Sequence, residues 1–442
     1  MTYKRYEKYK YSGIDWIGEV PAHWNIGGMT KYIDNIVDYR GKTPEKVKEG
    51  IFLVTAKNIK DGVINYDNSK EYVKYDDYEE VMKRGKPKIG EVLFTTEAPL
   101  GEVANVDNEN IALAQRIIKF SSNKQKLNNY FLKYWILSNG FQNNLKSLAT
   151  GSTAEGIKSS KLFNLKVVLP TISEQETIVR FLDSNISKID SLIEEKEKLI
   201  KLLKEKREAI ITEAVTKGVD KNVKMKNSGV EWIGDIPINW EISRLKFTTD
   251  KPFMYGANES AELDDKSLPR YIRITDIDEE GCLKKDTFKS MEYEKAKEFL
   301  LNDKDILFAR SGATVGKTYL YNLKDGSACF AGYLIKYTHN YKVIPEFIYY
   351  ITKSSWYSCW INQNTIQATI QNVSADKYKN LYIPLPDILE QGRIVDFLSK
   401  KCNEIKLVIT DIKNQINELR NYKKSLISEV VTGKIDVRDC KG

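Results

Sequence analysis

The sequence has few of the residues on which most metal and general-base sites depend. Among 442 residues there are two histidines, His23 and His339, and five cysteines without a CxxC pair. A His-rich metal centre is therefore excluded, and few candidates for a general base remain. An odd, scattered set of cysteines is typical of reduced thiols in the cytoplasm. The set comprises Cys282, Cys329, Cys359, Cys402 and Cys440.

Long apolar runs are absent as well. No stretch approaches the roughly 18–20 residues that a membrane-spanning helix needs, and the first 13 residues lack the apolar core of a signal peptide. We therefore expect no membrane association and a cytoplasmic location. With 41% hydrophobic and 29% charged residues the chain can build cores, and its length predicts two or three domains.

Catalytic motifs are missing too. The segment GATVGKT, Gly312 to Thr318, resembles a phosphate-binding loop, but Ser311 stands where GxxxxGK[ST] requires glycine. We find no GxGxxG, GxSxG, HExxH or Asn/Asp-Pro-Pro-Tyr/Phe motif. The sequence thus predicts no catalytic and no metal-binding residues. A nucleotide-binding enzyme that uses GATVGKT stays open as an alternative.

What the chain does contain is a tandem repeat. SGIDWIGEVPAHW, beginning at Ser12, returns as SGVEWIGDIPINW at Ser228, with seven of 13 positions identical. The same offset of 216 residues relates Leu169-Pro170 to Leu385-Pro386 and ITEAVTKGVD to ISEVVTGKID. Between these blocks the two copies diverge. A shared frame with a variable body suggests that the frame docks onto something common while each body reads something particular.

The variable bodies are expected to be mixed α+β domains. Short β-branched and aromatic runs bounded by Gly, Asn and Asp predict strands, namely IFLVTA, EVLFTT, RIIKF, DILFAR and YLIKY. A helix is predicted over residues 129–145.

One long helix follows each body. Thr171-x-x-Glu174 and Asp387-x-x-Glu390 fit capping boxes, and about 42 residues at 1.5 Å each give a rod of roughly 60 Å. Apolar residues at steps of three and four predict a coiled coil. We expect the rods to pair antiparallel within the chain; packing on their own domains or on another protein are the alternatives. The predicted seam comprises Ile189, Ile193, Ile200, Leu203, Ile210, Ile405, Ile409, Ile412, Ile416 and Leu419.

A net charge of +8 is compatible with nucleic-acid binding without requiring it. The Lys-rich segment 198–210 is interpreted as a solvated flank of the coiled coil. Polar loops of the bodies carry side chains able to contact phosphates and base edges. The DNA-binding candidates are Arg40, Lys42, Thr43, Lys57, Asn58, Thr96, Glu97, Gly151, Ser152, Thr153, Arg273, Thr275, Asp276, Arg310, Ser311, Gln367, Thr369 and Gln371.

The doubled pattern WIGxxPxxW, a variable domain, LPxxxEQxxIxxFL and a long helix ending in E[AV]VT resembles the specificity subunit of type I restriction–modification systems. The pattern spans Trp16 to Thr216 and again Trp232 to Thr432, so that the resemblance covers nearly the whole chain.

The resemblance implies a non-catalytic subunit that reads a bipartite, asymmetric target in double-stranded DNA. It also implies that the helical frame binds two methyltransferase subunits, and that motor–nuclease subunits join through them. S-adenosylmethionine, ATP and Mg²⁺ would then be used by those partners. The implied docking frame comprises Trp16, Trp24, Glu174, Gln175, Trp232, Trp240, Glu390 and Gln391.

The expected architecture is α+β, with two tandem mixed α/β target-recognition domains, two long helices and an internal pseudo-two-fold repeat. The expected segments are a first domain at 1–170, a helix at 171–218, a linker and second domain at 219–386, and a helix with C-terminal tail at 387–442. A coiled-coil scaffold that never touches DNA is the other alternative function.

Overall fold

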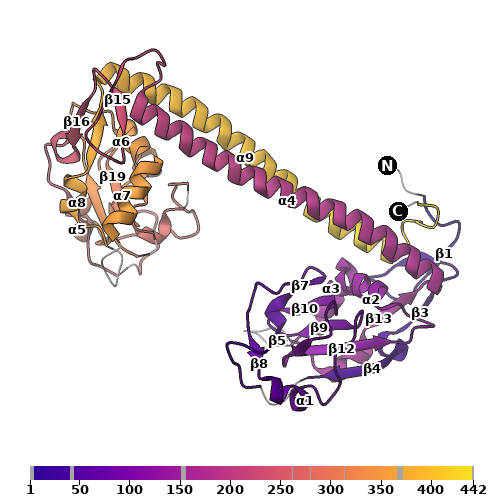
Figure 1. Ribbon diagram of the computed structural model, residues 1–442. Helices are drawn as coiled ribbons and strands as arrows, with labels where there is room; N and C mark the ends of the chain where they lie inside the picture. Colours follow the sequence, from indigo (N-terminus) through magenta and orange to yellow (C-terminus); the bar gives the residue numbers. More distant parts are fainter. Residues whose placement is uncertain are drawn as a thin grey trace. The chain divides into compact units, whose positions relative to one another are not determined.

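The computed structural model describes residues 4–39, 44–150, 156–260, 262–278, 280–312, 314–365 and 372–440. The chain forms two compact units (Figure 1). Unit 1 combines Met1–Lys196 with Lys413–Gly442, and unit 2 is Glu197–Ile412. Each unit therefore draws on two stretches of the duplicated sequence, and the division falls inside the long helices instead of beside them.

Each unit contains the same antiparallel four-stranded sheet. In unit 1 the strand order is β10-β9-β12-β4, and in unit 2 it is β20-β19-β22-β17. The expected α+β architecture of two tandem domains is thus confirmed. The bounds are β4 Ile33–Asp38, β9 Val92–Thr96, β10 Leu100–Asn105, β12 Ile117–Ser122, β17 Met254–Tyr255, β19 Ile306–Ala309, β20 Thr318–Leu320 and β22 Leu334–Tyr337.

A parallel strand pair lies beside this sheet in both units. In unit 1, β5 (Ile51–Val54) pairs with β11 (Ile111–Leu113), and in unit 2, β18 (Arg270–Ile272) pairs with β21 (Ala328–Phe330). Because parallel strands end at the same edge of a sheet, the loops that follow both strands of each pair emerge together. This topology positions the candidate site described below.

The remaining strands form short antiparallel pairs that also repeat. They are β1 (Tyr9–Tyr11) with β2 (Glu19–Pro21), β3 (Asn25–Gly28) with β13 (Lys166–Leu169), β14 (Met225–Asn227) with β15 (Asp235–Pro237), and β16 (Glu241–Arg244) with β23 (Tyr382–Leu385). Unit 1 adds β6 (Ile59–Lys60) with β7 (Val63–Ile64), and β8 (Tyr72–Val73) beside β5.

The helix predicted over residues 129–145 is in fact two helices, α2 (Asn129–Leu137) and α3 (Asn139–Leu148). Ser138 interrupts them because its backbone is extended and its side chain accepts a hydrogen bond from the Phe141 amide, which caps α3. Unit 2 repeats this arrangement with α6 (Pro345–Ile351) and α7 (Ser355–Thr365). The described residues also form the short helices α1 (Tyr78–Val81), α5 (Tyr293–Ala296) and α8 (Ala375–Lys379).

The two long helices are α4 (Ile172–Lys217) and α9 (Ile388–Val431). In unit 1 the first half of α4 contacts the last half of α9, where Lys196 donates to Gln415. In unit 2 the last half of α4 meets the first half of α9, and Arg207 and Cys402 line one cleft between them and the domain. In both units the pairing is antiparallel. Each domain is therefore packed against one half of its own helix and one half of the helix of the other repeat.

The predicted seam residues face the partner helix to different degrees. Ile189, Ile405, Ile409, Ile412 and Ile416 are buried. Ile193, Ile200, Leu203, Ile210 and Leu419 are half-buried. Of the half-buried residues, Ile193 and Leu419 pack against the core of unit 1 and Ile210 packs against the core of unit 2.

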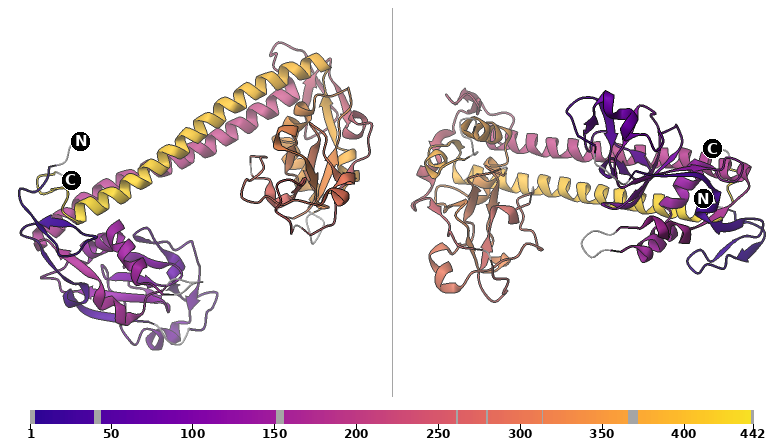
Figure 2. Two further views of the ribbon diagram at one scale, coloured as in Figure 1. Left: turned by 180° about the vertical axis from the view of Figure 1, so that it is seen from behind. Right: turned by 90° about the horizontal axis from the view of Figure 1, so that it is seen from below.

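In unit 1 the segment that precedes β2 contacts the segment that follows α9. Lys4 forms a β-bridge with Asp436, and the Tyr9 hydroxyl donates to the Gly433 carbonyl at 2.9 Å. Both views of Figure 2 place the two ends of the chain together beside unit 1. The corresponding place in unit 2 is occupied by the continuous segment that joins α4 to β14.

All five cysteines are free thiols. None of the helices among the described residues combines the length and apolar character that crossing a membrane would require. In the same part of the chain, no group of three or more His, Cys, Asp or Glu side chains is arranged to hold a metal ion.

Candidate nucleic-acid interface

A buried glutamine fixes each long helix to its domain. Gln175 accepts a hydrogen bond from the Asn128 amide at 2.8 Å and donates to the carbonyls of Lys126 and Pro170, both at 3.0 Å. Its side chain is fully buried. A buried polar group needs such partners, because an unmade hydrogen bond there costs about 1–3 kcal/mol.

Gln391 makes the same three bonds in unit 2. The Ile344 amide donates to it at 2.8 Å, and it donates to Lys342 and Pro386 at 3.0 and 2.9 Å. The Glu-Gln pair of the repeat is therefore a joint between helix and domain.

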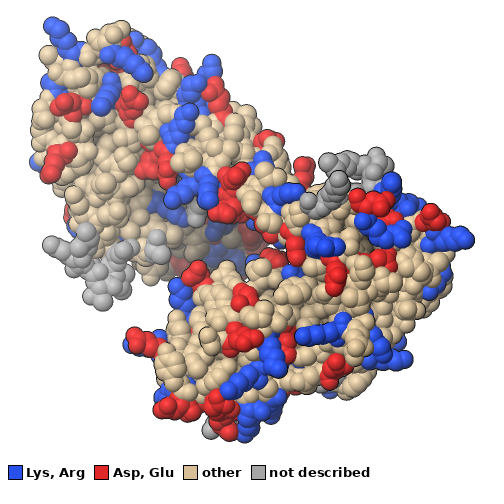
Figure 3. Space-filling model, turned by 45° about the vertical axis from the view of Figure 1, so that its right-hand side comes forward, with Lys and Arg blue, Asp and Glu red and all other residues tan. Residues whose placement is uncertain are grey.

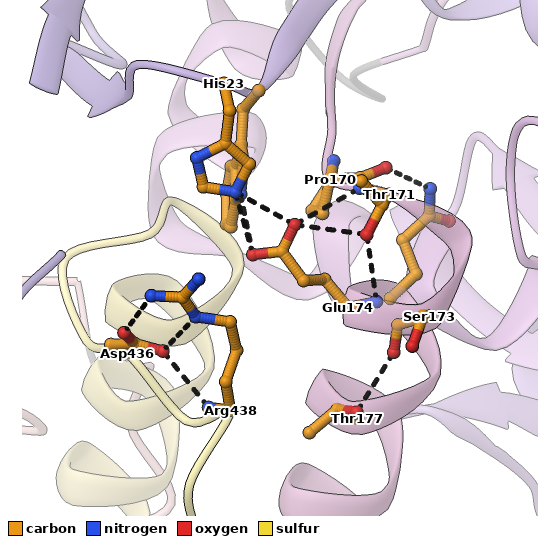
Figure 4. A network of polar contacts seen from close by, with 10 residues as sticks. His23, Pro170, Thr171, Ser173, Glu174, Thr177, Asp436 and Arg438 are labelled. Atoms are coloured by element: carbon orange, nitrogen blue, oxygen red, sulfur yellow. Dashed lines mark hydrogen bonds and ion pairs between the residues drawn. The ribbon is translucent and has the colours of Figure 1, made fainter. Parts of the chain in front are cut away.

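Glu174 forms the predicted capping box at the N-terminal end of α4 (Figure 4). Its backbone amide donates to the Thr171 hydroxyl oxygen at 3.3 Å, and its carboxylate accepts from the Thr171 amide at 3.4 Å. The same carboxylate lies 3.0 Å from Nε2 of His23 and accepts from Nε1 of Trp24 at 3.3 Å. Burial alone would raise the pKa of Glu174, but these hydrogen bonds outweigh it and lower the pKa below its usual value.

The second capping box is only half formed. The Glu390 amide donates to Asp387 at 2.8 Å, while the Glu390 carboxylate turns to Arg393 instead of the start of the helix. The reason lies in the sequence, since Arg393 replaces Thr177 and Asn239 replaces His23 at the offset of 216. The frame is thus equivalent in the two units but not identical.

Six of the eight residues assigned to partner docking lie in the interior. Trp24, Trp240, Glu174, Gln175, Glu390 and Gln391 are all buried, so they stabilise the joint and do not offer surface to a partner. Trp16 and Trp232 are half-buried and retain accessible surface. A docking role for the frame stays a prediction, and for the six buried residues it would be indirect.

Three loops converge at one edge of each domain, which we call the recognition edge. In unit 1 it comprises residues 55–58, 96–97 and 114–116, and in unit 2 residues 273–276, 310–311 and 331–333. Matching backbone hydrogen bonds hold them: Ala114 to Val54 and Ala331 to Ile272 at 2.9 Å, and Thr96 to Arg116 and Arg310 to Tyr333 at 2.9 and 3.0 Å. Isolated bridges add Gly156 beside Glu97 and Asn372 beside Ser311. The two edges therefore have one frame.

The structure brings several predicted DNA-binding residues together at these edges. Arg273, Thr275 and Ser311 line one cavity of about 620 Å³ in unit 2. Arg310 lies next to them, with its guanidinium 4.7 Å from the ring centre of Tyr255. In unit 1, Lys57 is exposed and Glu97 is half-buried. These side chains can reach a ligand.

Three candidates cannot face a base directly, because they are buried. Asn58 donates to the carbonyls of Asn65 and Ser69, and its oxygen caps Thr55. Asp276 holds the guanidinium of Arg273 at 2.7 Å, and the Thr96 hydroxyl donates to the Arg116 carbonyl at 3.2 Å. In this structure their polar groups are used in bonds that shape the edge, so direct base contact by these three residues stays a prediction that their burial does not favour.

The other candidates lie outside the described residues. These are Arg40, Lys42, Thr43, Gly151, Ser152, Thr153, Gln367, Thr369 and Gln371. Their contribution to binding stays a prediction.

Sequence reasoning missed two residues of the recognition edge. Arg116 has a left-handed backbone with φ +79° and pairs with Glu97 at 2.8 Å. Tyr333, at the equivalent place in unit 2, is 66% exposed and lines the cavity there. In the sequence, the only mark of each residue is that it follows a short apolar run. The parallel strand pairing that places it at the recognition edge is a tertiary feature.

The chemistry of the edges suits base reading. Arginine donates two bonds to guanine, carboxylates accept from cytosine, and aromatic rings contact bases or their methyl groups. Over the face seen in Figure 3, Lys and Arg are interspersed with Asp and Glu. Such a mixed surface favours contact through a few specifically positioned side chains over attraction by a broad basic surface.

The described residues of the GATVGKT segment before Thr318 lie between β19 and β20. Gly312 and Gly316 have φ of +78° and +83°, and strand β20 begins directly after Lys317. A phosphate-binding loop instead opens a helix, so this segment lacks that architecture.

Comparison with known proteins gives the family. A model described as the type I restriction modification DNA specificity domain matches residues 30–202 and again 237–418. The putative MjaX specificity subunit of Methanocaldococcus jannaschii is 24% identical over 96% of both chains. The EcoBI specificity subunit of Escherichia coli is 24% identical over 74% of this chain and 70% of that subunit.

Solved structures have the same fold. One chain, from work on complex assembly and conformational transition of the type I R-M system, has a TM-score of 0.68 at 17% identity, over 93% of this chain and 98% of that one. The HsdS subunit from Thermoanaerobacter tengcongensis has a TM-score of 0.50 at 17% identity, over 94% and 98%. With two copies of the matching domain covering most of its length, the chain belongs to the type I restriction–modification DNA specificity family.

Proposed function

We propose that this chain is the DNA-reading subunit of a type I restriction–modification complex and that its two domains read two unlike half-sites. The observation that carries the proposal is the pair of recognition edges. Their backbone frames match, but their side chains differ: Glu97 and Arg116 in unit 1 correspond to Ser311 and Tyr333 in unit 2. Equal frames with unequal chemistry fit a bipartite, asymmetric target.

The long helices would fix the spacing of the half-sites. Both helices run through the two units without interruption, and B-DNA presents equivalent faces every roughly 34 Å. A helical spacer between the readers would make the length of the unread gap part of the specificity.

The repeated frame would dock two methyltransferase subunits, and motor–nuclease subunits would join through them. Exposed apolar side chains support this, because they are unusual on a solvated helix surface and mark contact sites. On the helices they include Leu192, Leu199, Leu202, Leu407 and Val408. We place Trp16 and Trp232 in the same surfaces.

We assign no catalytic role to the chain. S-adenosylmethionine, ATP and Mg²⁺ would act in the partner subunits, and the complex would work on double-stranded DNA in the cytoplasm.

Reconstituted methylation tests this proposal. The methyltransferase subunits, with and without this chain, are incubated with genomic DNA, and modified adenines are mapped by sequencing. We expect methylation at one bipartite motif only when the chain is present. Sequence-specific methylation without the chain would contradict the proposal, and so would salt-independent or absent DNA binding by the complex.

A further inference from the structure

Each unit has a cleft between its domain and the long helices, and the two clefts are equivalent in position. In unit 1 the cleft includes Tyr134, Asp190 and Lys423, and in unit 2 it includes Tyr350, Lys406 and Arg207. Each residue of the second set lies at the offset of 216 from its counterpart. The duplication therefore provides two cavities of common origin, whose lining residues can be compared position by position.

The charges of the two clefts are opposite. The unit 1 cleft is lined by four carboxylates and two lysines. The unit 2 cleft, of about 670 Å³, is lined by six basic side chains and three carboxylates. The basic ones are Lys201, Lys204, Arg207, Lys317, Lys353 and Lys406.

Substitutions at equivalent positions cause this reversal. Lys406 stands in place of Asp190, and Lys353 in place of Leu137. In unit 1, Asp190 neutralises Lys423 at 2.8 Å. In unit 2 that carboxylate is lost, and Arg207 pairs with Glu280 from the domain instead.

Three ammonium groups of the unit 2 cleft have no carboxylate within ion-pair distance among the described residues. They belong to Lys317, Lys353 and Lys406. Lys353 donates to the Thr318 carbonyl at 3.2 Å and lies 4.6 Å from the ring centre of Tyr349. Burial, followed by the positive charge of Arg207, lowers the pKa of Lys353 to about 8.

This arrangement is unfavourable in the free protein and would be relieved by an anion. Like charges gathered in a partly desolvated cleft repel each other, whereas a phosphate group accepts several charge-assisted hydrogen bonds at once. We propose that the unit 2 cleft binds a phosphate-bearing anion, supplied by the DNA backbone or by a free polyphosphate, and that the unit 1 cleft does not. This site goes beyond the proposed reading of bases.

Pyrophosphate binding to the full-length chain tests the proposal without DNA or partner subunits. Calorimetric titration should give one site per chain, and Lys406→Asp, which installs the unit 1 residue, should weaken binding at least tenfold. Lys317→Met should do the same. Lys188→Met, at an exposed lysine of α4 outside both clefts, should leave the affinity unchanged.

Labelling identifies the cleft directly. Pyridoxal 5′-phosphate with borohydride should modify Lys353, whose lowered pKa leaves more neutral amine at pH 7.5, and pyrophosphate should protect it. Peptide mapping gives the site. Equal labelling and no protection at Lys353 would overturn the proposal, as would saturable pyrophosphate binding that Lys406→Asp leaves intact.

A DNA arm distinguishes the source of the phosphate. If DNA supplies it, a duplex of 20 base pairs should compete with pyrophosphate, and Lys406→Asp should reduce the salt slope of DNA binding by about one. If a free anion is the ligand, the slope stays unchanged while pyrophosphate still binds. Both outcomes support a phosphate site, and because pyrophosphate binding needs no base reading, failure of either proposal is recognised separately.

Discussion

The ammonium group of Lys423 lies 2.8 Å from both carboxylate oxygens of Asp190, although 233 residues separate the two in the chain. The contact joins the last half of α9 to the first half of α4 inside unit 1. Asp190 is half exposed, so the pair contributes little energy by itself. The contact does show that the two helices run antiparallel in this unit.

Charge reversal at this pair tests the pairing. Asp190→Lys should lower the free energy of unfolding of unit 1 by about 0.5–1 kcal/mol, since it places two cations together. Adding Lys423→Asp should restore most of the loss. The measurement is a double-mutant cycle in urea, and additive effects of the two substitutions would contradict the contact.

Loss of the buried glutamine should be far more costly. Gln175→Ala leaves the Asn128 amide and two carbonyls without a partner, and we expect a loss of about 1–3 kcal/mol. Gln391→Ala should cause the same loss in unit 2. Hydrogen-exchange mass spectrometry assigns each effect to its unit. Gln125→Ala, at an exposed site, is the control and should stay within about 0.5 kcal/mol.

Two glycines that end the long helices should differ in their tolerance. Gly218 and Gly433 both have left-handed backbones, with φ of +77° and +73°, so that alanine costs about 1 kcal/mol at either. At Gly433 a Cβ would also lie 2.3 Å from Pro21, whereas at Gly218 the nearest atom, in Glu390, is 3.2 Å away. Gly433→Ala should therefore lower the thermal midpoint more than Gly218→Ala. Equal shifts would show that the Pro21 contact gives way without cost.

The stability of unit 1 should depend on the ionisation of Glu174. Its pKa in the folded state is lowered below that of the unfolded chain, so its ionised form stabilises unit 1 above about pH 4.5 and this contribution is lost as the pH falls through the folded pKa. Glu174→Gln should therefore destabilise unit 1 at pH 7, and its difference from the parent chain should shrink below about pH 4.5. Urea midpoints between pH 3.5 and 7 measure this. Glu176→Gln, which changes an exposed neighbour, should give a constant difference.

Arg310 should matter for the second half-site alone. Arg310 belongs to the recognition edge, its Nε is buried without a hydrogen-bond partner among the described residues, and its guanidinium lies 4.7 Å from the ring centre of Tyr255. In the assembled complex, Arg310→Ala should cost about 1–3 kcal/mol of specific DNA affinity. Arg310→Lys should not restore it, because lysine lacks the planar pair of donors. Binding to duplexes altered in one half-site at a time separates the effects, and an equal loss at both half-sites would refute the assignment.

Local features carried much of the fold prediction. The five predicted strands, the Thr171–Glu174 capping box and the long helices depend on interactions between residues close in sequence. The helical pattern over residues 129–145 does not predict the break at Ser138, although its cause, a serine that caps the next helix, is also local.

The recognition edge could be predicted only in part. Polar loops pointed to Arg273, Thr275, Arg310 and Ser311, yet chemistry alone could not distinguish an exposed side chain from a buried one. Asn58 and Asp276 have the same polar character, but their side chains form hydrogen bonds with nearby backbone groups.

The sequence by itself determined the duplication, the α+β character and the paired long helices, because a fixed offset and apolar periodicity survive without any knowledge of contacts. Only the tertiary structure decided that each domain packs on halves of both helices, that the Glu-Gln joints are buried, and that two equivalent clefts carry opposite charge. These properties arise at contacts between strands and helices that are distant in sequence, and which side chains are buried at such contacts depends on the whole fold.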